Sequence, residues 1–366
     1  MRSDTVFLQK EQIYQTVSLY FFGMLKIISN SLGGVVVSLF NIPLFSKTYT
    51  KYYTIKFFGI IIYRKDLRPK LVKRILSKTN KSYDDIFLIR YNLGETVVFL
   101  SHLKQMLKFY GSKKPLFIVF RKKDIPFYSM YLLPHKVDFK FVELSGREIY
   151  EIYDLKDKPY KIKGQRFIAP IEKISEQIMF DFKNGKTSNF YDFIINSIGA
   201  KRIDPMFLPS VPKKAVKKIQ QINLTNVIIL CPEATSVQEL PTQFWQSLAK
   251  ELNNKGYTVF VNAFKEKNKI KNTKTAKLKL DELYALSEKA AGIITMANGI
   301  AIMMHNSKKM DIIYTPYHDN WFGYNATNTL KAYSIKHIPD LRGDIEEYDT
   351  SKYTMQQLIK AILNRY

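Results

Sequence analysis

Short apolar runs alternate with segments of helical periodicity from residue 82 onward. The run at residues 86–90 is followed by apolar residues at helical spacing over residues 96–110, and further apolar runs cover residues 115–120 and 137–142. Strand, helix and strand at this length predict a βαβ unit, in which a parallel sheet carries helices on its faces.

The second half of the chain repeats this pattern. Strands are expected at residues 226–231, 257–261, 291–296 and 311–315, and helices at residues 242–254, 279–289, 299–306 and 355–363. The sequence therefore predicts two α/β units in tandem. Three prolines and a run of lysines place the boundary between residues 199 and 221. Ligands of such sheets bind beyond the carboxyl ends of the strands, so the loops at these ends are the candidate site.

The composition limits the classes of partner and of metal site. The chain has 57 Lys and Arg against 32 Asp and Glu, a net charge of +25, which favours polyanions such as nucleic acid, anionic membranes or phosphorylated substrates. Part of this excess fits a general richness in Lys, Ile and Asn. The single cysteine, Cys231, excludes a disulfide scaffold and a cysteine-cluster metal site, and it favours a reduced intracellular setting.

The N-terminal segment, up to residue 80, is both apolar and basic. Residues 17–45 are the most apolar stretch, but Lys26 and the Gly33-Gly34 pair interrupt it, so we expect a peripheral or buried segment instead of a membrane span. Residues 39–47 are echoed by residues 57–65. Aromatic and apolar side chains interleaved with cations suit the surface of an anionic bilayer. A β-hairpin packed on the body of the chain, with solvated lysines, is the alternative, and the two are compatible.

Three segments resemble the nucleotide-sugar glycosyltransferases of the GT-B fold, and among these the heptosyltransferases of glycosyltransferase family 9 and their relatives in capsule and surface-polysaccharide clusters. These segments are residues 86–110, 227–263 and 280–300, about half of the chain. They are similar to the strand, Gly-Asp loop and helix of the first domain, to the Pro-Gly-Ala-Ser loop and helix, and to the donor-site helix, strand and Asp-Ser-Gly loop.

The chain also departs from the pattern of this family. It has Ala297, Asn298 and Gly299 in place of Asp-Ser-Gly, and Ile302 where the family has a histidine. Pro-Gly-Ala-Ser has become Pro-Glu-Ala-Thr at residues 232–235. The resemblance therefore does not identify the donor sugar. It implies transfer without a metal, and the scattered histidines show no ligand spacing.

Sugar transfer needs a base for the acceptor hydroxyl, and Glu95 is the candidate because it follows a strand at the start of a helix. Its neighbour Gly94 would allow the donor to approach the backbone closely. A glutamate in the first turn of a helix is also favoured by the helix dipole alone, which is the alternative.

The remaining candidates for donor binding are short polar residues and a glycine in the loops that precede helices. One group is Thr235 and Ser236, and the other is Asn298 and Gly299. We expect each group to lie at a helix N-terminus, which could bind a phosphate. Ordinary N-capping would explain the same residues without a ligand. Asn262, with Lys265, is expected near the base or ribose of the nucleotide.

The sequence as a whole predicts a GT-B arrangement of two Rossmann-like domains that face each other across a cleft. We expect an N-terminal extension at residues 1–80, an acceptor domain at 81–205, a donor domain at 206–345 and a C-terminal helix at 346–366. The predicted function is inverting, metal-independent transfer, with no cofactor, from a nucleotide-diphosphate sugar to a lipid-linked or surface-polysaccharide acceptor. Such an enzyme would work on the cytoplasmic face of the cell membrane.

Two alternatives come from other observations. The changed Asp-Ser-Gly loop fits an inactive glycosyltransferase-like module that binds a nucleotide or glycan. The net charge with 14% aromatic residues fits a nucleic-acid-binding protein. The cations are concentrated in the N-terminal segment and between the two α/β units, which favours an enzyme without a nucleic-acid partner.

Overall fold

The structure is a computed structural model of the 366-residue chain. It describes residues 7–318 and 325–366 outside the gaps 12–13, 22–24, 31–34, 40–41, 50–51, 59, 67, 78–82, 90–92, 121, 144–159, 163–164, 169–188, 221–225, 263–269, 272 and 276–277. The chain forms two compact units. Unit 1 comprises Met1–Leu88 and Val142–Ala169, and unit 2 comprises Ile89–Phe141 and Pro170–Tyr366. The domain limits at residues 80, 205 and 345 stay a prediction.

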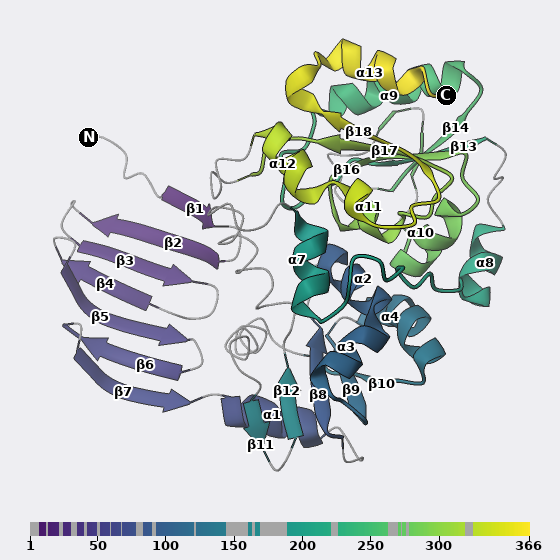
Figure 1. The fold of residues 1–366 in the computed structure, drawn as a ribbon. Coiled ribbons are helices and arrows are strands. Elements are labelled where there is room, and N and C mark those ends of the chain that lie inside the picture. Colours follow the sequence, from purple (N-terminus) through teal and green to yellow (C-terminus); the bar gives the residue numbers. More distant parts are fainter. Residues whose placement is uncertain are drawn as a thin grey trace. The chain divides into compact units, whose positions relative to one another are not determined.

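Unit 1 contains a seven-stranded antiparallel sheet whose strands follow one another in chain order (Figure 1, purple). The strands are β1 (Phe7–Glu11), β2 (Tyr14–Phe21), β3 (Leu25–Asn30), β4 (Val35–Leu39), β5 (Ile42–Tyr49), β6 (Tyr52–Phe57) and β7 (Ile60–Asp66). The apolar stretch at residues 17–45 therefore contributes to four strands of this sheet. The echoed segments at residues 39–47 and 57–65 each include most of the second strand of an antiparallel pair, β5 in β4–β5 and β7 in β6–β7.

The described residues in the rest of unit 1 form one helix and a small group of strands. Helix α1 (Arg68–Ser77) precedes β8 (Asp85–Ile89), which pairs in parallel with β12 (Gln165–Ile168), and β11 (Tyr160–Ile162) pairs antiparallel with β12. The Asp85 carboxylate is fully buried and accepts two hydrogen bonds from the Arg166 guanidinium, at 2.5 and 2.6 Å. Such a fork-shaped pair neutralises a carboxylate that would be unfavourable alone in the interior.

The first part of unit 2 consists of helices and a parallel strand pair. It contains α2 (Leu93–Ser101), α3 (Leu103–Tyr110), β9 (Pro115–Val119), α4 (Ile125–Leu132), β10 (Asp138–Phe141), α7 (Phe190–Ser197) and α8 (Lys213–Ile219). Strands β9 and β10 are parallel. Short 3-10 turns cover Lys122–Asp124 and Leu133–His135.

The prediction of a single helix at residues 96–110 is wrong. The chain forms two helices there, α2 and α3, which are separated at His102. The His102 ring is fully buried, and its Nε2 lies 3.0 Å from the Tyr191 hydroxyl of α7. Burial lowers the pKa of His102 to about 4, opposed in part by Asp204, so the ring is neutral at pH 7. The sequence did not indicate this break, because the helical spacing of apolar residues continues from α2 into α3.

The second part of unit 2 is a six-stranded parallel sheet in the order β15-β14-β13-β16-β17-β18. Its strands are β13 (Val227–Cys231), β14 (Thr258–Val261), β15 (Lys274–Thr275), β16 (Gly292–Met296), β17 (Lys309–Tyr314) and β18 (Asp344–Asp349). Its helices are α9 (Thr242–Asn254), α10 (Leu280–Ser287), α11 (Gly299–Met303), α12 (Ala326–Tyr333) and α13 (Met355–Leu363), with 3-10 turns at Ile335–His337 and Thr350–Lys352.

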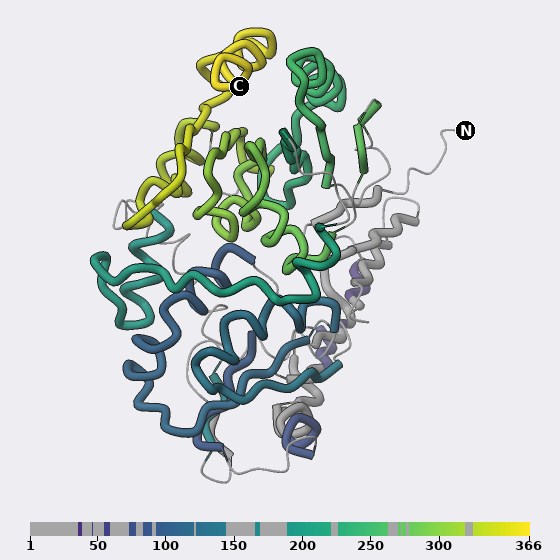
Figure 2. Tube along the Cα trace, turned by 90° about the vertical axis from the view of Figure 1, so that its right-hand side faces the viewer, coloured from purple at the N-terminus to yellow at the C-terminus, as the bar shows by residue number. Residues whose placement is uncertain are grey.

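Helices α9 and α13 lie side by side on one face of this sheet, and α10 and α11 lie on the other (Figures 1 and 2). Trp245 and Leu248 of α9 and Leu358 of α13 pack on Ile228 and Ile294 of the central strands. The two central strands, β13 and β16, are buried from end to end, as expected for a parallel sheet covered on both faces. The mixed α/β class is thus confirmed.

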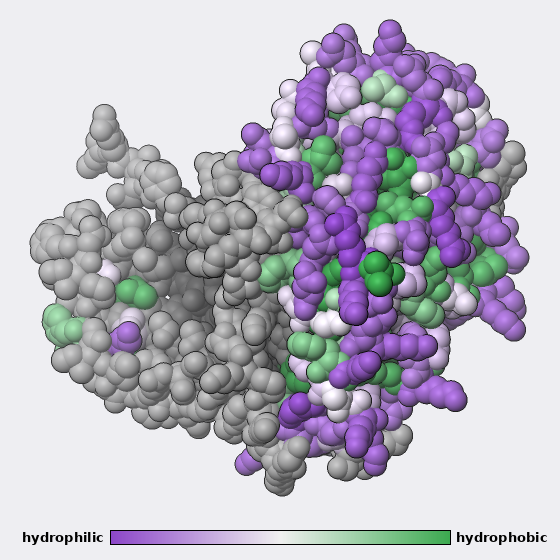
Figure 3. Space-filling model, in the orientation of Figure 1, coloured by the Kyte–Doolittle hydropathy of each residue, from purple (hydrophilic) through white to green (hydrophobic). Residues whose placement is uncertain are grey.

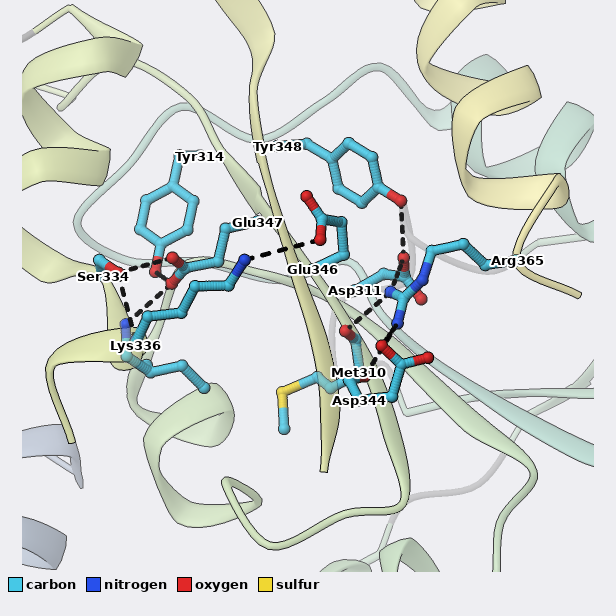
Figure 4. Close-up of polar contacts among 11 residues, drawn as sticks. Met310, Asp311, Tyr314, Ser334, Lys336, Asp344, Glu346, Glu347, Tyr348 and Arg365 are labelled. Atoms are coloured by element: carbon cyan, nitrogen blue, oxygen red, sulfur yellow. Dashed lines mark hydrogen bonds and ion pairs between the residues drawn. The ribbon is translucent and has the colours of Figure 1, made fainter. Parts of the chain in front are cut away.

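The C-terminus is fixed to the sheet by a buried aspartate (Figure 4). The Asp311 carboxylate of β17 is fully buried and accepts hydrogen bonds from Arg365 Nη1 at 2.6 Å, Tyr366 Oη at 2.8 Å and Tyr348 Oη at 2.9 Å. Arg365 also forms an ion pair with Asp344, with 2.7 Å between Nη2 and Oδ1. Arg365 and Tyr366 therefore both donate hydrogen bonds to the Asp311 carboxylate inside the sheet, and Arg365 also neutralises its charge.

A second group of polar contacts in Figure 4 connects β17 and β18 to the turn after α12. The Glu347 carboxylate accepts hydrogen bonds from the hydroxyls of Tyr314 and Ser334, at 2.7 and 2.6 Å. The backbone N–H of Ile335 donates to the same carboxylate at 2.8 Å. These contacts fix the edge strand β18, whose charged sequence did not indicate a strand.

Deletion of Arg365 and Tyr366 should destabilise the protein strongly, because it leaves the Asp311 carboxylate buried without its cation. The expected loss in the free energy of unfolding is about 3–5 kcal/mol, measured by urea denaturation. The matched control is Arg202→Ala. It breaks an exposed Arg–Asp pair, Arg202 with Asp192 at 3.3 Å, and should change stability by about 0–1 kcal/mol. Equal effects of the two changes would contradict the assigned role of Asp311.

Candidate functional site

The candidate site lies at the carboxyl ends of three neighbouring parallel strands, β13, β16 and β17. The loops that follow these strands are residues 232–241, residues 297–298 and residues 315–318, all in unit 2. Because the strands are parallel, their carboxyl ends meet at one edge of the sheet, where ligands of such folds bind.

Asn298 connects the first two of these loops. It is the N-cap of α11, and its Oδ1 accepts hydrogen bonds from the backbone N–H groups of Ile300 and Ala301, at 2.9 and 3.2 Å. Its Nδ2 donates to the carbonyl oxygen of Glu233 at 2.8 Å. Asn298 therefore fixes the start of α11 and the loop after β13 with one side chain. These are structural bonds, and its contact with a donor stays a prediction.

The loop after β13 is also bonded to the segment that follows β17. Gln238 N–H donates to the carbonyl of Pro316 at 2.8 Å, and His318 N–H donates to the carbonyl of Ser236 at 3.1 Å. The Thr315 hydroxyl donates to the carbonyl of Gln238 at 2.6 Å. Nothing in the sequence pattern indicated this pairing. Residues 319–324, which follow this segment, lie outside the described residues.

Thr235 and Ser236 occupy this loop and are exposed. They are not at a helix N-terminus, because α9 begins only at Thr242 and its N-cap is Pro241. The expectation that these two residues lie at a helix N-terminus is thus wrong, since Val237 pairs with Tyr317 before the helix begins. They remain candidates for donor contact through their hydroxyl groups alone.

Asn262 follows β14 and is buried. Its Oδ1 accepts a hydrogen bond from the backbone N–H of Leu278 at 3.3 Å, so the side chain holds the segment that leads into α10. Lys265 lies outside the described residues. A role of Asn262 near the nucleotide base stays a prediction.

Gly94 and Gly299 bring the starts of two helices into backbone contact. A Cβ atom on Gly299 would lie 2.5 Å from the backbone nitrogen of Gly94 and 2.7 Å from the Cβ of Leu93. A Cβ atom on Gly94 would lie 2.8 Å from Cδ1 of Ile302. Neither position has room for a side chain unless a neighbour moves. The two motifs that the sequence assigned to different halves of the chain therefore meet here.

Glu95 is the residue next to this contact. It is half-buried in the first turn of α2, directly after Gly94. Its backbone position is consequently fixed beside the loop of residues 297–299. Ile302, which occupies the place of the family's histidine, is the side chain that covers Gly94.

Two acidic residues lie in the first turn of α10. Glu282 accepts a hydrogen bond from the backbone N–H of Lys279 at 2.9 Å and pairs with Lys218 Nζ at 2.8 Å. Asp281 shares this first turn, and burial raises its pKa. The pair joins α8, which the sequence treated as part of a linker, to the start of α10.

Within the part of the chain that the structure describes, no group of three or more His, Cys, Asp or Glu side chains could hold a metal ion. The same part contains no helix with the length and apolarity to cross a membrane.

Cys231 is buried at the end of β13, and burial raises the pKa of its thiol to about 12. It is therefore not a reactive nucleophile at neutral pH.

Comparisons with known proteins gave matches among solved structures only, since no protein-family model and no curated protein matches the chain. A glycosyl transferase family 9 protein from Veillonella parvula is 12% identical, over 78% of this chain and 98% of that one, with a TM-score of 0.47. The E. coli ADP-heptose lipopolysaccharide heptosyltransferase II is 13% identical, over 77% and 99%, with a TM-score of 0.45. E. coli heptosyltransferase WaaC with ADP is 9% identical, over 77% and 99%, with a TM-score of 0.43. These are likenesses of fold.

Alanine at either glycine should test the contact between α2 and α11. Gly299→Ala places its Cβ against backbone atoms, so we expect a loss of about 1–3 kcal/mol in the free energy of unfolding, measured by urea denaturation. Gly94→Ala meets only the flexible end of Ile302 and gains about 0.5–1 kcal/mol of helix propensity, so its net effect should be smaller.

Ile302→Val removes the Cδ1 atom that a Cβ on Gly94 would meet. The double variant Gly94→Ala/Ile302→Val should therefore be more stable than the sum of the two single changes, where Ile302→Val alone costs about 0.5–1.5 kcal/mol. Wild-type stability of Gly299→Ala, together with strict additivity in this cycle, would show that the two helix starts are not in contact.

Proposed function

We propose that this protein is a glycosyltransferase that moves a sugar from a nucleotide-diphosphate sugar to a lipid-linked or surface-polysaccharide acceptor. The contact between Gly94 and Gly299 is the observation that carries this proposal. It brings the candidate base, Glu95, beside the loop that resembles the donor loop of the family. A transferase needs these two functions at one place, because the acceptor hydroxyl must attack the donor carbon directly.

In this proposal Glu95 is the general base of an inverting displacement. The acceptor oxygen attacks the anomeric carbon from the side opposite the leaving group and forms the new glycosidic bond. The bond between that carbon and the diphosphate oxygen breaks, the electron pair leaves with the nucleoside diphosphate, and the hydroxyl proton passes to the Glu95 carboxylate.

The leaving diphosphate needs positive charge in the absence of a metal. The dipole of the nine-residue helix α2 favours an anion at its N-terminal end. Gly94 and Gly299 place the starts of helices α2 and α11 side by side. Thr235, Ser236 and Asn298 are the polar side chains that we assign to the donor, and Asn262 is assigned to the nucleoside.

The acceptor class follows from the resemblance of the three sequence segments and from the charge of the N-terminus. Residues 1–78 contain 13 Lys and Arg against three Asp and Glu. Such a segment is attracted to anionic lipids by about 1 kcal/mol for each cation near the surface. We propose that the protein works at the cytoplasmic face of the membrane, where lipid-linked acceptors are presented.

An inactive module that binds a nucleotide or glycan without transfer is the second candidate. Ala297 and Ile302 favour it, because they replace an acid and a histidine of the family pattern with side chains that carry no charge or hydrogen-bonding group. A nucleic-acid-binding protein is a third candidate, favoured by the net charge of +25 together with 14% aromatic residues.

The test is release of nucleoside diphosphate from a panel of nucleotide sugars, with glycolipid extracts as acceptors. We expect turnover that survives EDTA and falls by about 10²–10⁴-fold in Glu95→Gln, while nucleotide affinity measured by calorimetry is unchanged. Glu288→Gln is the matched control, because Glu288 is also a half-buried carboxylate at a helix end, and its turnover should stay at the wild-type level.

The same assay separates the alternatives. Full turnover in Glu95→Gln would remove the base assignment. Nucleotide binding without turnover for every donor would favour the inactive module. Oligonucleotide binding that persists at physiological salt, with no affinity for nucleotide sugars, would favour the nucleic-acid-binding protein.

A further inference from the structure

The segment at residues 199–207, which follows α7 in unit 2, lies alongside helix α3. Gly199 is packed against Phe109 near the end of α3, since a Cβ atom on Gly199 would lie 2.5 Å from Cδ2 of the Phe109 ring. Further along the segment, the backbone N–H of Phe207 donates to the carbonyl oxygen of Ser101, two residues before α3 begins, at 3.0 Å. The segment therefore extends beside α3 from the end of the helix to its start.

The 3-10 turn at Leu133–His135 adjoins the same end of α3. The centroids of the His135 and Phe207 rings lie 4.7 Å apart. Burial lowers the pKa of His135, and the nearby Lys104 ammonium in the first turn of α3 lowers it further. Helix α3, the segment at residues 199–207 and this turn thus form one continuous surface of unit 2, which we call the α3 surface.

The three most exposed large apolar side chains among the described residues of unit 2 all lie on the α3 surface. Phe109, Leu133 and Ile203 are 56%, 61% and 80% exposed, and no other such side chain in that part of the chain exceeds 44%. Ile203 lies in a tight turn, because the N–H of Asp204 donates to the carbonyl of Lys201 at 2.9 Å. Polar residues and glycine are usual in such turns, so folding does not explain an isoleucine there.

Exposed cations flank these apolar side chains on each element of the α3 surface. They are Lys104 and Lys108 of α3, Lys201 and Arg202 of the segment after α7, and Lys136 beside the 3-10 turn. The four lysines form no ion pair with another described residue, whereas Arg202 pairs with the half-buried Asp192 at 3.3 Å. The half-buried Asp204 carboxylate accepts a hydrogen bond from the backbone N–H of Lys201. The exposed charge of the surface is therefore mostly positive.

Apolar and cationic side chains are interspersed on the α3 surface, and Figure 3 shows hydrophobic residues interspersed with hydrophilic ones over the visible face of unit 2. A protein–protein interface instead gathers its apolar side chains in a centre that is depleted of charge. At a bilayer surface, separate apolar side chains enter the headgroup region while cations beside them contact the lipid phosphates. The pattern on the α3 surface therefore matches an anionic bilayer better than a protein partner.

We propose that the α3 surface of unit 2 binds an anionic lipid bilayer. Phe109, Leu133 and Ile203 enter the headgroup region, and the lysines around them contact lipid phosphates. This inference deepens the membrane location proposed above, but it rests on a different part of the chain and does not depend on the transfer reaction. A single-stranded nucleic acid fits less well, because only Phe109 among the three apolar side chains has an aromatic face on which a base could stack.

The first test places a fluorescent label in the turn that holds Ile203. The single cysteine of the chain, Cys231, is buried, so a thiol-reactive nitrobenzoxadiazole label should react selectively with Ile203→Cys. Without donor or acceptor, the labelled full chain should show a blue shift and a severalfold rise in emission with vesicles of phosphatidylcholine and phosphatidylglycerol at physiological salt. Vesicles of phosphatidylcholine alone should cause no change. Gln356→Cys, an exposed position on α13, is the matched control and should show neither effect.

The second test removes charge from the α3 surface. Lys104→Ala/Lys108→Ala should weaken co-sedimentation with the anionic vesicles by about 30-fold, because each cation near such a surface contributes a factor of about five. Lys250→Ala/Lys360→Ala is the matched control, since it removes the same charge from exposed positions of α9 and α13, and it should bind within about twofold of the wild type. Urea denaturation should give wild-type stability for both variants, because only exposed side chains change.

A label at Ile203→Cys that stays unshifted in protein bound to vesicles would overturn this inference and leave membrane association through the N-terminal segment intact. Equal affinities of the two double-lysine variants for the anionic vesicles would overturn it as well. A label that shifts with a single-stranded oligonucleotide at physiological salt, but not with vesicles, would assign the α3 surface to nucleic acid instead. Because no sugar is present, these results are independent of whether the protein is a transferase.

Discussion

The backbone contact between Gly94 and Gly299 is the constraint on which the candidate site depends. A Cβ atom on Gly299 would lie 2.5 Å from the backbone nitrogen of Gly94, so the start of α2 lies directly against the start of α11. Asn298 then holds α11 to the loop after β13 through Glu233, and that loop is bonded to the segment after β17. The backbone contact between Gly94 and Gly299 thus sets the backbone position of Glu95 relative to three loops of the parallel sheet.

Buried charge in the described chain is used mainly for architecture. Asp85 is paired with Arg166, Asp311 with Arg365, and Glu282 with Lys218. Each pair joins segments that are distant in sequence, and each would leave an unfavourable buried carboxylate if its cation were removed. These pairs explain why acidic residues inside the fold do not gather into a metal-binding group in the part of the chain described.

The sequence predicted the parallel sheet of unit 2 well because strands buried on both faces are continuous apolar runs, and the bounds of α9 and α13 agree with the prediction. It missed β18, whose sequence Asp-Ile-Glu-Glu-Tyr-Asp is charged because this strand lies at an edge. It also missed the full antiparallel sheet of unit 1, since only the echo of residues 39–47 in residues 57–65 was evident.

The sequence identified several residues of the candidate site, but it did not predict how they are arranged. Gly94, Asn298 and Gly299 were singled out by their places after strands, which fold topology explains. Asn298 is the N-cap of α11, whereas its predicted contact with a donor stays a prediction. The position of Thr235 and Ser236 was wrong because their loop continues to Pro241, held by bonds to residues 316–318 that no local pattern encodes. Contacts between backbone groups distant in sequence leave no signature in side-chain periodicity.

The most direct measurement is a crystal structure of the protein with a bound nucleoside diphosphate. The account predicts that the diphosphate lies against residues 297–299 and the first turn of α2, within reach of N–H groups of both, with the Glu95 carboxylate facing the side from which an acceptor would approach. A diphosphate bound elsewhere on the chain, or a nucleotide complex in which α2 and α11 are separated, would contradict it.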